Sequence, residues 1–151
     1  MSGAGPIWKR TPDLAVLNAS HRRTAVEYLG IRFSAFGDDW LAAQIEVNDH
    51  TVQPMGILHG GMSVVLAETV GSTAANLCID YNRYRAVGAE INANHVRMAS
   101  SGWVTGTARP VSLGRQLQVW QIDIEDAGGR RVCISRLTMA VIEASGRLPR
   151  D

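Results

Sequence analysis

Residues 59–79 read HGGMSVVLAETVGSTAANLCI, and this stretch decides the fold. Apolar and small residues run through positions 62–79 with no turn signal, a length that favours a helix. A pair of buried strands is the alternative, because valine and threonine are frequent. On a helical wheel, the face opposite Glu68 carries Leu66, Val70, Thr73 and Leu77. Since apolar side chains surround the axis almost completely, the helix is expected to be buried on most sides.

Glu68 is the only carboxylate between Asp49 and Asp80. Burying an unpaired carboxylate costs several kcal/mol unless it is paired, hydrogen-bonded or protonated. Two glycines precede the helix and would leave bare backbone N–H groups at its start. On the wheel, Glu68 shares its face with Gly61, Val64, Val65, Ser72 and Ala75. The sequence therefore indicates a functional site around Glu68, with a purely structural carboxylate as the alternative.

The rest of the chain is dominated by strand patterns. Extended structure is expected over residues 29–36, 40–47, 85–96, 102–110, 116–125 and 131–142, with turns at 37–39 and 126–129. A short helix is expected over residues 11–18, begun by the capping residue Thr11 and followed by Pro12. The order of short helix, two strands, long helix and four strands predicts an α+β fold, with an antiparallel sheet packed against one dominant helix.

Composition narrows the function classes. The chain has 151 residues, 46% hydrophobic and 19% charged, which suits one globular domain. A formal net charge of +1 gives no reason to expect a nucleic-acid partner. No apolar run has the length of a membrane span, and the first residues lack a signal-peptide core, so a cytoplasmic location is expected. Cys78 and Cys133 read as reduced core residues, and no cysteine or histidine cluster suggests a metal.

Residues 53–72, QPMGILHGGMSVVLAETVGS, carry a family resemblance. Supporting segments are IWKR at 7–10, GDD at 37–39, EINANHVR at 90–97, LG at 113–114 and VWQI at 119–122. Together they resemble hotdog-fold thioesterases that act on aromatic acyl-CoA, the group of bacterial 1,4-dihydroxy-2-naphthoyl-CoA hydrolases and enterobactin-pathway proofreading thioesterases. The resemblance implies a curled antiparallel sheet around one long central helix. It places this domain at residues 7–143, between a flexible tail at 1–6 and a tail at 144–151.

The resemblance also implies catalytic roles. Gly60 would polarise the thioester carbonyl through its N–H at the helix N-terminus, where the helix dipole adds positive potential. Glu68 would act as nucleophile or as general base, and the sequence leaves this choice open. Gln53 would orient the carbonyl or the water, and His59 would hold the acyl carbonyl and its loop. Ser72 lies one helical turn after Glu68 and would reach the same pocket.

Coenzyme A would bind at a subunit interface, so the resemblance implies a homo-oligomer, expected to be a tetramer. Arg97 and Arg115 are the expected phosphate partners, because a guanidinium can bind phosphate bidentately. The residues implied for the CoA channel are Gly88, His95, Val96, Arg97, Met98, Ser112, Leu113, Gly114, Arg115, Gln116 and Leu117. No metal and no separate cofactor are expected, since CoA is part of the substrate.

The resemblance thus implies hydrolysis of 1,4-dihydroxy-2-naphthoyl-CoA, or another aromatic acyl-CoA, to free acid and CoA. Two alternatives stay open. The protein could proofread misacylated acyl or aryl carrier protein or act broadly on acyl-CoA, or it could bind CoA or an acyl ligand without catalysis. A pure binder gains nothing from a buried base, so Glu68 disfavours the last alternative. Met55 and residues 79–85 differ from the relatives and leave the acyl group open.

Overall fold

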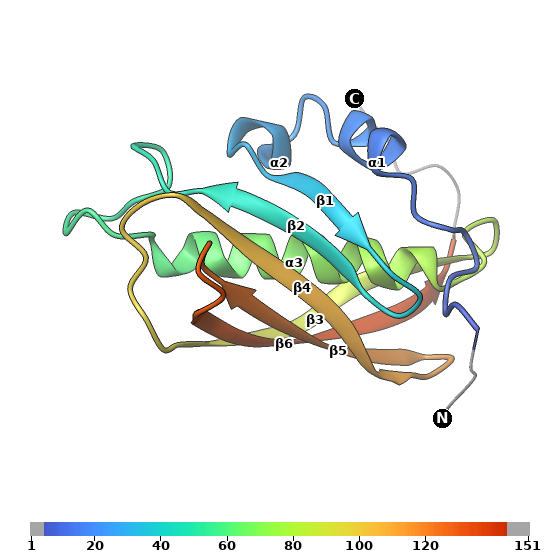
Figure 1. Ribbon diagram of the computed structural model, residues 1–151. Coiled ribbons are helices and arrows are strands. Elements are labelled where there is room, and N and C mark those ends of the chain that lie inside the picture. Colours follow the sequence, from blue (N-terminus) through green and yellow to red (C-terminus); the bar gives the residue numbers. More distant parts are fainter. Residues whose placement is uncertain (1–4, 145–151) are drawn as a thin grey trace.

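A computed structural model describes residues 5–144 (Figure 1). One antiparallel sheet in the order β1-β2-β4-β5-β6-β3 curls around the helix α3 (Gly60–Leu77). Its strands are β1 (Arg32–Phe36), β2 (Leu41–Glu46), β3 (Tyr84–His95), β4 (Trp103–Leu113), β5 (Leu117–Glu125) and β6 (Arg131–Glu143). The expected α+β architecture is confirmed. Apart from Gly5, Pro6 and Ala144, the predicted tails at 1–6 and 144–151 lie outside the described residues.

The central helix starts two residues earlier than the sequence pattern predicts. His59 is its N-cap, with extended backbone angles of φ −62° and ψ 132°, and its Nδ1 accepts a hydrogen bond from the Gly61 N–H at 2.8 Å. A single helix of 18 residues makes the alternative of two buried strands wrong. The expected burial on most sides is confirmed, because no residue of α3 is exposed, although Glu68 and Thr73 are only partly buried.

The face of α3 that is turned toward the sheet packs against buried side chains of β5 and β6. Ile122 and Leu137 are fully buried beneath the helix. Gly71 makes the contact close, since a Cβ atom built there would lie 2.6 Å from Leu137 Cδ2 and 3.3 Å from Ile122 Cδ1. The absence of a side chain at Gly71 therefore sets how near α3 can approach the sheet.

Replacing Gly71 by valine should overfill this contact. We expect Gly71→Val to lower the free energy of unfolding by about 1–3 kcal/mol, the usual cost of overpacking a tight core. Thr73→Val is the matched control, because it places the same side chain two residues further on a half-exposed face. Urea unfolding of both variants measures the difference. Equal stability of the two would contradict the close approach at Gly71.

The N-terminal segment differs from the sequence expectation. The first helix, α1 (Leu14–Ser20), is capped by Asp13, whose carboxylate accepts from the Val16 N–H at 3.1 Å, and not by Thr11. A second short helix, α2 (Ala25–Tyr28), was not predicted, and it delays the start of β1 from residue 29 to residue 32. Its signal was present as a Thr24 cap followed three residues later by an acidic side chain.

The two edges of the sheet are unequal. At the β1 edge, the side chain of Asn18 in α1 bonds to both the N–H and the C=O of Phe33. The other edge is β3, a strand of 12 residues that is exposed along residues 87–90 and, among residues 5–144, pairs only with β6. A long unpaired edge is a template for pairing with another chain. The position of β3 therefore matters for how the protein assembles.

Candidate active site

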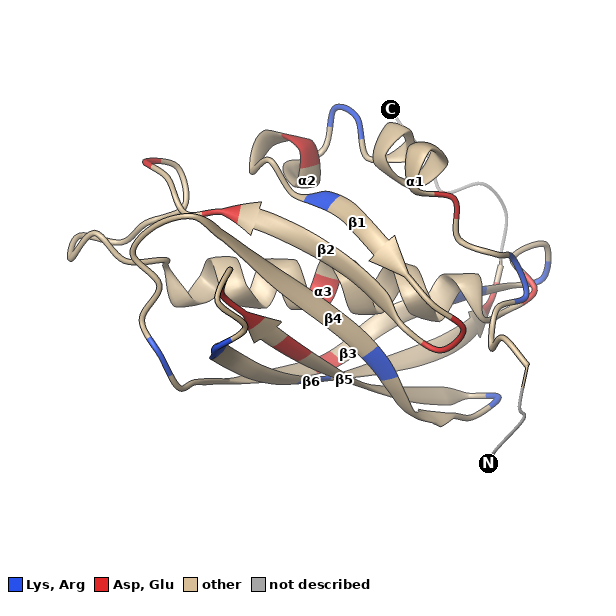
Figure 2. Cartoon of the chain, viewed as in Figure 1, with Lys and Arg blue, Asp and Glu red and all other residues tan. Residues whose placement is uncertain are grey.

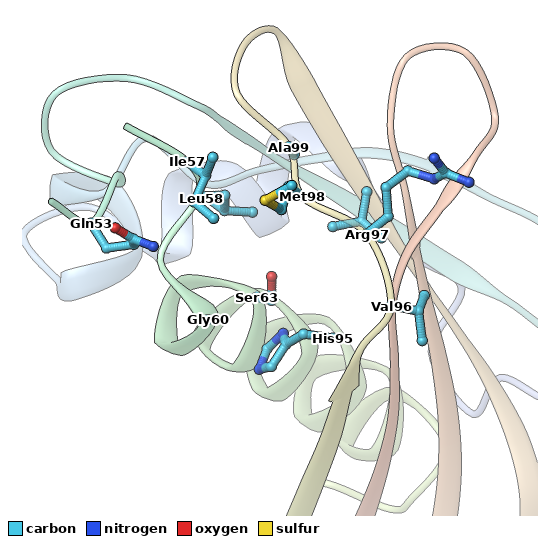
Figure 3. Close-up of a pocket in the computed structure, with 11 residues that line it drawn as sticks. Gln53, Ile57, Leu58, Gly60, Ser63, His95, Val96, Arg97, Met98 and Ala99 are labelled. Atoms are coloured by element: carbon cyan, nitrogen blue, oxygen red, sulfur yellow. The ribbon is translucent and has the colours of Figure 1, made fainter. Parts of the chain in front are cut away.

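A cavity of about 550 Å³ opens at the N-terminus of α3 (Figure 3). It lies between the loop before the helix and the segment that follows β3. Its walls are formed by Gln53, Ile57, Leu58, Gly60, Ser63, His95, Val96, Arg97, Met98, Ala99 and Val132. Most of this lining is apolar, with a few polar groups that converge at the helix start, which is the usual composition of a small-molecule site.

Gly60 is the first residue of α3, and its N–H has no acceptor among residues 5–144. The imidazole of His95 covers its Cα side, because a Cβ atom built on Gly60 would lie 2.9 Å from His95 Nε2. A free N–H at a helix N-terminus adds the positive end of the helix dipole to an open hydrogen bond. This end of the cavity can therefore receive a carbonyl oxygen or an oxyanion.

Gln53 and His59 have different surroundings. Gln53 lines the cavity, and its Oε1 accepts from the Met55 N–H, so its amide NH₂ is left to meet a ligand. His59 is exposed, is not among the cavity-lining residues and uses Nδ1 to cap the helix. His59 therefore caps the helix, whereas Gln53 lies beside the cavity, and the expected contact of His59 with the acyl carbonyl stays a prediction.

Glu68 is the single acidic residue on α3, visible in Figure 2 as the only charged band on the central helix. Its carboxylate lies directly against Gly88 of β3, where an added Cβ atom would collide with Glu68 Oε1. Within the described part of the chain, no group donates a hydrogen bond to it or pairs with its charge. Burial raises the pKa of the Glu68 carboxyl above its usual range.

Ser72 does not reach the cavity at the start of α3. It lines a separate space of about 640 Å³ between α1 and the C-terminal half of α3. Its Oγ is 3.5 Å from the carbonyl oxygen of Thr69, which is the back-bonding expected of a helical serine. Ser72 therefore lies away from the cavity at Gly60, and its expected place in the same pocket as Glu68 stays a prediction.

The residues predicted to bind CoA divide into two groups. His95, Val96, Arg97 and Met98 line the cavity beside Gly60. Leu113, Gly114, Arg115 and Gln116 line a second cavity of about 930 Å³, together with Cys78 at the other end of α3. An 18-residue helix is about 27 Å long. Ser112 and Leu117, both exposed, flank the second group, and Gly88 lies between the groups against Glu68.

The two cysteines are both free, as expected. Cys133 is buried, whereas Cys78 is half-buried and faces the second cavity. Burial raises the pKa of the Cys78 thiol to about 12 and also raises the pKa of Cys133. Both thiols are therefore protonated at neutral pH and are poor nucleophiles.

Metal-ligating clusters and membrane-spanning helices are both absent from the described residues. Within residues 5–144, His, Cys, Asp and Glu side chains form no group of three that could hold a metal ion. None of the helices in the described part of the chain combines the length and apolar character that a membrane span requires.

Sequence reasoning missed one polar residue of the first cavity, Ser63. It is 2% exposed and lines the cavity three residues after Gly60. The spacing was a usable signal, because residues three apart on a helix lie on the same face. On the wheel, however, Ser63 falls outside the face that carries Glu68.

A sheet curled around a helix that presents an open N–H and one carboxylate defines a hotdog-fold enzyme that acts on a carbonyl group. The sequence model of the Thioesterase superfamily matches residues 55–133, and the chain belongs to this superfamily. The expected hotdog fold and the expected activity class, thioester hydrolysis, are both confirmed.

Individual relatives support this assignment. A 1,4-dihydroxy-2-naphthoyl-CoA hydrolase of Escherichia coli is 52% identical over 136 residues, which cover 90% of this chain and 99% of the relative. A proofreading thioesterase, EntH, of Cronobacter turicensis is 49% identical over 136 residues, 90% of this chain and 98% of the relative. A crystal structure of a mutant thioesterase PA1618 from Pseudomonas aeruginosa superimposes with a TM-score of 0.90 at 50% identity, covering 91% and 99% of the two chains.

Proposed function

We propose that this thioesterase hydrolyses an aromatic acyl-CoA, with 1,4-dihydroxy-2-naphthoyl-CoA as the leading substrate, to the free acid and CoA. One observation carries the proposal: a single helix presents an open N–H at Gly60 and one half-buried carboxylate at Glu68. The substrate class rests on the 52% identity to the Escherichia coli naphthoyl-CoA hydrolase.

The two groups supply complementary chemistry. The Gly60 N–H would donate to the thioester oxygen as negative charge develops there, and such a donor is worth about 2.7–4 kcal/mol in the transition state. In one route, Glu68 would attack the carbonyl carbon, the C–S bond would break with release of CoA thiolate, and water would hydrolyse the mixed anhydride to free acid and Glu68. In the other, Glu68 would remove a proton from a water that attacks the carbonyl carbon, and breakage of the C–S bond would release CoA. Both routes require the ionised carboxylate, and the choice between them stays open.

The distance along α3 argues against a site within one chain. Gly60 and Glu68 are eight residues apart, which corresponds to about 12 Å of helix axis. A carbonyl bound to the Gly60 N–H lies beyond the helix start and therefore further still from Glu68. Since reacting atoms must approach to about 3–3.5 Å, we infer that each site combines Gly60 of one chain with Glu68 of a second copy.

Pairing through the exposed β3 edge would produce this combination. A two-fold axis near the middle of β3 would join two copies as antiparallel strands and continue the sheet. The Gly60 end of one chain would then lie beside the Arg115 end of the other. The two separated groups of CoA residues would meet in the same way, which supports the expected homo-oligomer. The expected tetramer stays a prediction.

A carrier-protein substrate is the second candidate, because the Cronobacter relative is named a proofreading thioesterase. A substrate panel separates the two candidates. Purified protein is offered naphthoyl-CoA thioesters, fatty acyl-CoA and an aryl-loaded carrier protein, and thiol release is followed. We expect the highest kcat/KM with the naphthoyl-CoA thioester. A higher value with the carrier protein would favour proofreading, and release from no thioester would overturn the proposed function.

Glycine at position 88 should be required for activity, because a side chain there would displace the Glu68 carboxylate. An alanine methyl group at Gly88 would occupy the space of Glu68 Oε1 and displace the carboxylate. We expect Gly88→Ala to lower kcat/KM about 10–100-fold, because displacing a reacting group by about 1 Å has an effect of this size. The control is a double mutant. Adding Gly88→Ala to Glu68→Gln should cause little further loss, and a full additional loss would show that Gly88 acts independently of Glu68.

Activity should fall on acidification at a pH above the ordinary glutamate range. Burial raises the pKa of Glu68, so protonation removes the reactive carboxylate before an exposed glutamate would titrate. We expect kcat/KM to decline as pH falls through an apparent pKa above about 4.5. A profile of kcat/KM against pH measures this value. An acid limb at or below the ordinary value would contradict the desolvated environment of Glu68.

A further inference from the structure

Ser63 is a buried polar residue with no assigned partner. It lies in the first turn of α3, is 2% exposed and lines the cavity that begins at Gly60. Its hydroxyl makes no hydrogen bond to any residue in the described range 5–144. A helical serine commonly bonds back to a carbonyl three or four residues earlier, and Ser63 does not. The hydroxyl is thus available to a ligand.

The surroundings of Ser63 show where such a ligand would lie. In Figure 3 its oxygen points away from α3 into the cavity, with His95 beside it and Met98 across from it. Helical side chains lean toward the N-terminus, so a residue covers the turn before its own Cα. For Ser63, that turn begins at Gly60, whose N–H is also unpaired within the described residues.

The choice of serine at position 63 also indicates a role for its hydroxyl. Alanine is the stronger helix former, so helix propensity gives no reason for a serine here. The Ser63 oxygen is not sealed in the core without a partner, since it borders the open cavity. By contrast, the equally buried Ser135 donates its hydroxyl to the Asn92 carbonyl oxygen at 2.8 Å. A serine kept for packing alone would be expected to satisfy its hydroxyl as Ser135 does.

We propose that the Ser63 hydroxyl is a second hydrogen-bond donor to the thioester carbonyl oxygen, beside the Gly60 N–H. The inference rests on the proposed function and deepens it by adding a catalytic residue. Two donors stabilise a developing oxyanion better than one, and the gain is larger in the transition state than in the ground state. Ser63 therefore contributes mainly to kcat.

Kinetics of Ser63→Ala test the proposal. We expect kcat to fall about 100-fold, since removal of one oxyanion donor costs about 10²–10³, and KM to rise by no more than about tenfold, the share of one ground-state hydrogen bond. The melting temperature should stay the same or rise, because no protein hydrogen bond is lost. Ser135→Ala is the matched control, expected to lower the melting temperature and leave kcat unchanged. An unchanged kcat in Ser63→Ala, or a rise in KM alone, would overturn the proposal.

Two substrate analogues test the carbonyl contact independently of turnover. One is an aryl ketone analogue of the thioester, in which CH₂ replaces sulfur and the carbonyl remains. The other is an S-arylmethyl-CoA thioether, which has no carbonyl. Ser63→Ala should bind the ketone about tenfold more weakly than the wild type and the thioether equally well, since one hydrogen bond is removed. Equal weakening for both would place Ser63 on another part of the ligand and overturn the proposal. If the wild type hydrolyses no thioester, the proposed function fails, and these binding measurements still decide the carbonyl contact.

Discussion

Glu68→Gln should reduce kcat/KM about 10²–10⁴-fold, the range that general acid–base catalysis supplies. The amide has the shape of the carboxylate, but it can neither accept the proton of an attacking water nor attack a carbonyl. The substitution removes a half-buried charge that has no partner within residues 5–144, so folding should not suffer. Release of CoA from an aryl-CoA substrate, followed with a thiol reagent, measures the loss.

The folding stability of Glu68→Gln shows whether its loss of activity comes from lost catalysis rather than from misfolding. Burial raises the pKa of Glu68 in the folded state, so the folded protein holds this proton more tightly than the unfolded chain does. The stability that the proton provides is fully present below the unfolded pKa and is lost as pH rises through the folded pKa. Glutamine does not ionise, and Glu68→Gln should therefore gain stability relative to the wild type as pH rises. Glu46→Gln, at an exposed position on β2 and away from the β3 edge, is the control and should change neither property. Wild-type turnover in Glu68→Gln would contradict a catalytic carboxylate.

Gly60→Pro should lower kcat/KM about 10²–10³-fold relative to Gly60→Ala, the usual cost of losing one oxyanion donor. Proline is favoured at the first position of a helix and lacks only the N–H that Gly60 leaves unpaired among the described residues. His59, with φ −62° and ψ 132°, already has the conformation required before proline. The chain is therefore suited to a variant that removes one donor and retains the helix.

The alanine variant isolates the N–H from steric effects. Both substitutions add a Cβ atom that would press on His95 at 2.9 Å, so the cost of moving that ring is shared. Circular dichroism and melting temperatures of the two variants should agree. If Gly60→Pro and Gly60→Ala had equal kcat/KM, the Gly60 N–H would not be a donor to the substrate.

Most of the fold could be predicted because its patterns are local. The long apolar stretch at 62–79 and the four later strand patterns each match an element within a few residues. The helix begins at Gly60 rather than at Met62, since glycines carry no apolar signal and the start is decided by the His59 cap. The helix α2 was overlooked because it has only four residues, too few to show a helical period.

Candidate site residues could be named from the sequence, but their arrangement in space could not. Spacing within the motif identified Gly60 and Glu68, and a helical wheel reports direction around the axis. A wheel carries no distance along the axis, so it could not show that the two groups lie about 12 Å apart. The packing of Glu68 against Gly88 depends on where β3 returns to the helix, which is a tertiary contact that no local pattern contains.

A subunit-mixing experiment tests the proposal of a shared active site most directly. Glu68→Gln and Gly60→Pro chains are each inactive alone and are then unfolded and refolded together. In a mixed pair, one site would combine the intact Gly60 of the first chain with the intact Glu68 of the second. Random pairing with one good site in each mixed pair predicts recovery of about a quarter of the wild-type activity. Activity no higher than that of the separate variants, in a sample shown to contain mixed oligomers, would place both groups in one chain and contradict the account.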